Sequence, residues 1–77
     1  MLDTTRELRP HPEFPLRLFV TRKARGLSQE KLALAIDTDA NTIANWEKGR
    51  YKPTDELLYR LVQFLGMEHA AYLLEEE

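Results

Sequence analysis

The sequence predicts an all-α domain of four to five short helices. Apolar residues recur at three- and four-residue spacing in successive segments, and capping residues or glycines separate these segments. No run alternates between apolar and polar side chains as a half-buried strand would. With 77 residues and no cysteine, the chain lies near the lower size limit for folding around one core without disulfides or metal. A compact core or a partner is therefore required.

The first helix is expected to begin at Pro15 and to end before Gly26. Prolines restrict residues 10–15 to extended or turn conformations, so residues 1–14 are expected to form a flexible N-terminal arm. Within the helix, Leu18 and Phe19 provide an apolar edge. Gly26 stands where a residue with left-handed backbone conformation commonly follows a helix.

Two short helices are expected next, joined by a turn of about three residues. Ser28 can cap the second helix, whose apolar residues end at Ile36. Thr38 or Asp39 can cap a third helix at about 39–47, in which Ile43 and Trp46 share one face. So short a connection sets two helices at a steep angle.

The widest apolar stripe of the sequence lies in the fourth helix, which Pro53 and Thr54 open and Gly66 ends. A weaker pattern predicts a short fifth helix and an acidic tail over residues 67–77. The apolar residues of this segment either close the core or contact a second copy. The stripe comprises Leu57, Leu58, Leu61, Val62 and Leu65, and the apolar residues of the last segment are Ala70, Tyr72, Leu73 and Leu74.

The net charge of −2 argues at first against nucleic acid as a partner. The charges are unevenly distributed, however, because residues 16–66 contain nine basic and six acidic side chains, a net charge of +3. The acidic excess belongs to the two ends of the chain. Since the Debye length at physiological salt is only about 8 Å, local charge governs contact with phosphate more than total charge does.

Catalysis and metal binding find no support in the sequence. Ser28 is the only serine and occupies a capping position, and the two histidines have no partners at ligand or base spacing. No glycine-rich phosphate loop and no zinc-ligand spacing occurs. We therefore expect no catalytic residues, no metal and no cofactor. No signal peptide and no membrane-spanning run is recognisable, so a cytoplasmic protein is expected.

Several spaced positions between residues 16 and 66 follow one family pattern: Arg22, Gly26–Gln29, Leu32–Ala33, Ile43, Asn45–Gly49, Pro53 and the Leu57, Leu61, Leu65 spacing. Through these positions, residues 16–66 resemble the lambda-repressor-like helix-turn-helix family of phage repressors and Cro proteins, also called the XRE family. The turn departs from the family pattern, with Asp37 in place of the usual glycine and Thr38 in place of an aliphatic residue. Aspartate tolerates the left-handed conformation better than most residues, so the turn should survive.

The resemblance implies a helix-turn-helix DNA-binding domain over residues 15–66, and it implies a role for each matching residue. Arg22 would pair with Glu47 and hold the recognition helix in place. On spacing alone, the amides of the third helix would be a solvated face and the cations after it solubilising charges. With the family pattern, bases would be contacted by Ala40, Asn41, Ala44 and Asn45, and phosphates by Gln29, Thr42, Lys48, Arg50, Tyr51 and Lys52.

Two functions follow as expectations. The first is a sequence-specific transcriptional regulator, a repressor encoded by a bacterium or a phage, that binds double-stranded DNA as a homodimer. The second is a protein-interaction module with the same fold, such as an antitoxin-like or adaptor protein, whose partner docks on the C-terminal helix. The negative net charge favours the second, and the family pattern favours the first.

Overall fold

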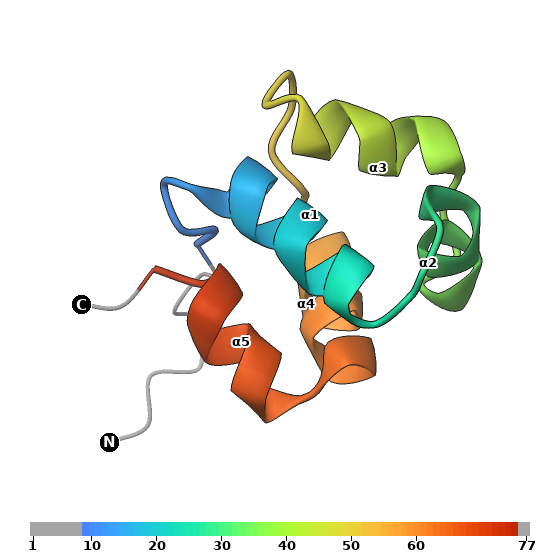
Figure 1. Ribbon diagram of the computed structural model, residues 1–77. Coiled ribbons are helices and arrows are strands. Elements are labelled where there is room, and N and C mark those ends of the chain that lie inside the picture. The colour runs from blue at the N-terminus through green and yellow to red at the C-terminus, as the bar shows by residue number, and fades with distance from the viewer. Residues whose placement is uncertain (1–8, 76–77) are drawn as a thin grey trace.

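Five helices follow one another in the computed structural model, which describes residues 9–75 (Figure 1). Over these residues the only β-type pairing is an isolated bridge, and the predicted all-α class is confirmed. None of the described helices has the length and apolar character needed to cross a membrane. The helices are α1 (Phe14–Ala24), α2 (Gln29–Ala35), α3 (Ala40–Glu47), α4 (Asp55–Leu65) and α5 (Met67–Leu73).

Side-chain caps begin the three middle helices at the positions that the sequence predicts. The Ser28 hydroxyl accepts a hydrogen bond from the backbone N–H of Lys31 at 3.0 Å, and the Thr54 hydroxyl accepts one from that of Leu57 at 3.3 Å. Asp39 caps α3, because its carboxylate accepts both the backbone N–H of Thr42 at 2.8 Å and the Thr42 hydroxyl at 2.9 Å. These bonds, the backbone N–H first, lower the pKa of Asp39 below its usual value.

The turn between α2 and α3 uses a left-handed residue that is not glycine. Asp37 has a φ of 63°, in the region that aspartate tolerates better than most residues. Its backbone N–H donates to the carbonyl of Leu34 at 3.2 Å, and that of Thr38 donates to the carbonyl of Ala33 at 2.9 Å. The turn thus closes α2, and α2 packs directly against α3 (Figure 1).

One core joins all five helices. The α4 stripe is its centre, with Leu58 and Leu61 fully buried, and Phe14 meets the Trp46 ring edge-on at a centroid distance of 6.3 Å. Phe19, expected on the apolar edge of α1, is exposed, so this expectation is wrong. Leu73 is fully buried and closes the core, which is one of the two alternatives for the last segment. The core residues are Phe14, Leu18, Leu32, Ala33, Ile36, Ile43, Trp46, Leu58, Leu61, Leu65 and Leu73.

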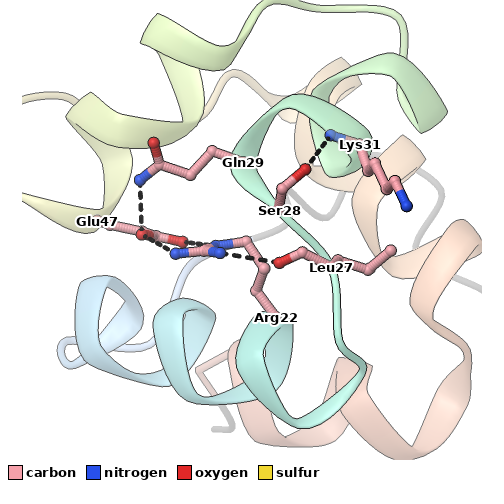
Figure 2. A network of polar contacts seen from close by, with 6 residues as sticks. All are labelled: Arg22, Leu27, Ser28, Gln29, Lys31 and Glu47. Atoms are coloured by element: carbon pink, nitrogen blue, oxygen red, sulfur yellow. Dashed lines mark hydrogen bonds and ion pairs between the residues drawn. The ribbon is translucent and has the colours of Figure 1, made fainter.

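A buried ion pair clamps α3 to α1 (Figure 2). The Arg22 guanidinium donates to both carboxylate oxygens of Glu47, from Nε at 2.6 Å and from Nη2 at 3.0 Å. The two side chains are only 7% and 8% exposed. Arg22 also donates to the carbonyl of Leu27 at 2.8 Å, and the contact with Glu47 raises the arginine pKa further above its ordinary value. Arg22 therefore stays charged at any pH at which the protein folds.

The described part of the expected N-terminal arm lies against the C-terminal segment. The backbone N–H of His11 donates to the carbonyl of Leu73, and that of Glu75 donates to the carbonyl of Arg9, both at 2.8 Å. Pro10 forms the bridge with Leu74 between these two bonds, where no N–H is needed. Residues 9–11 are thus tied to the end of α5, while residues 1–8, also assigned to the arm, lie outside the described residues.

Truncation of Glu47 is expected to destabilise the domain strongly. Glu47→Ala strands the Arg22 charge in a buried position, which costs about 3–5 kcal/mol of unfolding free energy. The matched control is Glu56→Ala, because Glu56 and Arg60 are also 2.6 Å apart but exposed. Its cost should be below about 1 kcal/mol. Urea unfolding at neutral pH measures both values, and equal losses would contradict the structural role of the pair.

The Asp39 cap should make stability depend on pH in the acid range. A pKa lowered by folding stabilises the protein above the unfolded value of about 3.9, and this contribution is lost as the pH falls through the folded pKa. Asp39→Asn keeps a capping oxygen without the charge. We expect the wild type to melt above the variant near pH 7, with the difference shrinking in the acid range and disappearing once Asp39 is protonated in the folded protein. A melting-temperature difference that stays constant over this range would argue against the charged cap.

Candidate nucleic-acid interface

The outward side of α3 presents amide and methyl groups. Asn41 is exposed, and Asn45, one turn further along, is half-buried, as are Ala40 and Ala44. The opposite side of α3 is fixed by the core, which contains Ile43. The four predicted base-contacting residues therefore lie on the side of α3 that faces away from the core.

The amides have the chemistry needed to read a base. An Asn side chain carries one acceptor and two donor hydrogens, which match N6 and N7 of adenine in the major groove. Asn41 and Asn45 are about 6 Å apart along the helix axis, since each residue rises 1.5 Å. Ala40 and Ala44 beside them are small enough for a helix to approach thymine methyl groups closely.

The loop after α3 places a cluster of cations next to this face. Lys48 ends the helix, Gly49 takes a φ of 76°, and the backbone N–H of Arg50 donates to the carbonyl of Asn45 at 3.0 Å. Lys48, Arg50 and Lys52 are all exposed, and none of them forms an ion pair with another residue of the described range 9–75. Tyr51, also exposed, lies between the last two. These are the groups that phosphate oxygens attract.

Two predicted phosphate contacts already have partners within the protein. The Thr42 hydroxyl donates its proton to Asp39, so it has no second proton to give to a phosphate. The Gln29 amide donates to the Glu47 carboxylate at 3.1 Å (Figure 2). One N–H of that amide remains for a phosphate. The structure thus gives both residues an internal role that the sequence did not predict.

The hydrogen bond between Gln29 and Glu47 is the part of the site that sequence reasoning missed. Glu47 receives three hydrogen bonds, two from Arg22 and one from Gln29, so its carboxylate links α1, α2 and α3. No pattern in the sequence predicts a contact between two residues that lie 18 positions apart on different helices. The start of α2 and the end of α3 are held in register by this one carboxylate.

The residues described give no sign of a metal centre. No group of three or more histidine, aspartate or glutamate side chains in this part of the chain is placed to hold an ion. The candidate interface comprises helix α3, the cations after it and the start of α2.

Comparison with known proteins agrees with this geometry. A helix-turn-helix family model matches residues 21–73. An uncharacterised HTH-type transcriptional regulator of Methanothermobacter thermautotrophicus is 41% identical over 58 residues, which cover 73% of this chain and 84% of that protein. The restriction-modification controller protein C.AhdI of Aeromonas hydrophila superposes with a TM-score of 0.65 and 32% identity, over 69% of this chain and 80% of its own.

A second solved structure extends the likeness of fold. The clp gene regulator ClgR of Corynebacterium glutamicum superposes with a TM-score of 0.66 and 24% identity, over 78% of this chain and 70% of its own. The resemblance found in the sequence is thereby confirmed. The chain belongs to the XRE family of helix-turn-helix proteins.

Proposed function

We propose that the protein is a sequence-specific transcriptional regulator that inserts α3 into the major groove of double-stranded DNA. The observation that carries the proposal is the continuity of the outward α3 face with the exposed cations after it. Family membership supports the general function of a DNA-binding transcriptional regulator. The finer assignment of residues to bases and phosphates is our inference from the chemistry of this surface.

In this proposal the two amides of α3 select the sequence. Asn41 and Asn45 would each pair with an adenine edge, and Ala40 and Ala44 would contact thymine methyl groups. We therefore expect half-sites that contain A·T pairs opposite the start and middle of α3. The buried clamp between Arg22 and Glu47 supports the reading, because base discrimination needs the helix to keep one orientation.

The cations after α3 would supply most of the affinity. Lys48, Arg50 and Lys52 would lie along the phosphate backbone, with the Tyr51 hydroxyl as a further donor. Gln29 would add one phosphate bond through its remaining N–H, and Thr42 would lie close to the backbone without donating to it. The total charge of −2 does not oppose this arrangement, since the acids lie mainly at the ends of the chain.

We further propose that two copies bind a pseudo-palindromic site, with half-sites about one helical turn, or 34 Å, apart. Occupation of such a site within a promoter would repress transcription. Neighbouring copies bound this way would share one two-fold axis with the DNA.

The alternative function, a protein-interaction module such as an antitoxin-like or adaptor protein, has less support. It would rely on the C-terminal helix, but the apolar residues Ala70 and Leu73 of α5 are buried in this chain. Selection of bound duplexes from a random pool separates the two functions. An enriched inverted repeat supports the regulator, and no enrichment at any salt concentration would support the module.

Removal of two loop cations should flatten the salt dependence of DNA binding. Each lost phosphate contact changes the slope of log K against log salt by about 0.9, so Arg50→Ala with Lys52→Ala should reduce it by about 2 per protomer. The control Arg60→Gln removes a positive charge from α4 whose guanidinium already pairs with Glu56 and Asp37, and it should leave the slope unchanged. Fluorescence anisotropy over a salt series measures this slope for each protein. A slope that falls equally in both proteins would contradict the assignment.

Loss of one amide should relax sequence preference at one base pair. Asn45→Ala removes a contact worth about 1–3 kcal/mol of discrimination, so the preference for the selected base should fall by roughly 5- to 150-fold while binding to random duplex hardly changes. Gln63→Ala, an exposed amide on α4, is the matched control. Competition with single-base variants of the operator measures the change in preference. An unchanged preference in Asn45→Ala would show that Asn45 does not contact a base.

A further inference from the structure

The outward side of α1 is an apolar surface that no other described segment covers. Leu16 is 60% exposed, and Phe19 and Val20 are each 43% exposed. In Figure 1 helix α1 crosses the near side of the molecule, with α3 above it, α4 behind it and α5 beside it. Three large apolar side chains on one side of an 11-residue helix are more than chance exposure in so small a domain.

The C-terminal helix offers less apolar surface. Ala70 and Leu73 of α5 are buried in the core, and Tyr72, which is 39% exposed, has the guanidinium carbon of Arg17 4.6 Å from its ring centroid. Arg17 also donates to the Tyr72 carbonyl at 2.8 Å. The outward side of α5 thus carries one large exposed apolar side chain, Tyr72, against three on α1, so α1 is the better apolar surface.

The charges at the two ends of this α1 surface are opposite in sign. Glu13 lies at its start and Lys23 near its end, with Leu16 and Val20 between them at helical spacing. Both charged side chains are exposed, and among residues 9–75 Lys23 has no acidic partner, while Glu13 only approaches Arg17 at 3.8 Å. An acid at one end and a base at the other end complement a copy of the same helix turned around.

An antiparallel copy fits this pattern in register. When two α1 helices are related by a two-fold axis level with Leu18, Glu13 of one lies level with Lys23 of the other, and Leu16 lies level with Val20. A two-fold contact of this kind is isologous, since the same surface serves both copies. Phe19 flanks the contact and stays 43% exposed, with the Lys23 ammonium 5.9 Å from its ring centroid.

We propose that a second copy of this chain docks on the outward side of α1, helix against antiparallel helix. The assignment rests on the homodimer within the proposed function and names the surface that forms it. The contact relies on three apolar side chains and two charge pairs, so the dimer is weak in solution. Attraction between Glu13 and Lys23 of opposite copies selects the antiparallel arrangement over a parallel one, which would align like charges.

Sedimentation equilibrium of the full chain tests the proposal from micromolar to millimolar concentration. Leu16→Glu and Val20→Glu should each raise the dimer dissociation constant at least about tenfold, because each places a carboxylate in the apolar centre. The matched control is Leu34→Glu, since Leu34 on α2 is 81% exposed and lies outside this surface. It should self-associate like the wild type. Thermal unfolding checks that all three variants fold.

Exchanging the charges of Glu13 and Lys23 tests the antiparallel contact more directly. Glu13→Lys and Lys23→Glu should each weaken self-association, and the double variant should restore it, because the pairs re-form with exchanged signs. A wild type that stays monomeric at millimolar concentration, a Leu34→Glu variant as impaired as Val20→Glu, or a double variant weaker than both single ones would each overturn the proposal.

Binding to a duplex with one half-site distinguishes the proposal of DNA binding through α3 from the proposal of self-association through α1. If Val20→Glu binds this duplex as the wild type does while its self-association is lost, both proposals are supported. If the wild type binds no duplex but self-associates as described, the proposed function fails and the α1 surface stands.

Discussion

The position of the recognition helix depends on one buried carboxylate. Glu47 lies at the end of α3 and receives hydrogen bonds from Arg22 of α1 and from Gln29 of α2. A buried ion pair adds little net stability compared with apolar residues of the same volume, because both ions lose their hydration. Its directional bonds do fix geometry, however, since a guanidinium and a carboxylate meet in one planar arrangement. The apolar core determines that α3 packs on α1, and Glu47 determines how α3 is oriented there.

The remaining arginines show how a small domain uses its basic residues. Arg17 and Arg25 donate to the carbonyls of Tyr72 and Leu65, near the C-terminal ends of α5 and α4, and Arg60 bonds to Glu56. These cations therefore serve the fold as well as its surface. The cations with no acidic partner among residues 9–75 include Lys48, Arg50 and Lys52 after α3, which the proposed function assigns to phosphate contacts. A net negative chain can thus carry a local basic surface.

The sequence predicted the helices well because their signals are local. Ser28, Asp39 and Thr54 cap the helices that follow them, and the stripe of α4 contributes Leu58, Leu61 and Leu65 to the core. The features that the sequence predicted poorly depend on contacts between residues that are far apart in the chain. Phe19 lies on the outward side of α1 because the buried side is defined by α3 and α5, whose positions a helical repeat does not encode. The same limit applies to the hydrogen bond between Gln29 and Glu47, which depends on how α2 packs against α3.

Helix α1 connects the two surfaces that the proposals assign. Its inward side carries Arg22, which orients α3 through Glu47, and its outward side carries Leu16 and Val20, only two to six residues away. A rigid helix of 11 residues allows little movement between these sides. If two copies meet through α1, each α3 is therefore fixed relative to the two-fold axis by one helix and one ion pair. The spacing of the half-sites then depends on the contact between the two α1 helices. A weaker ion pair between Arg22 and Glu47 would reduce both the discrimination between bases and the preference for one half-site spacing.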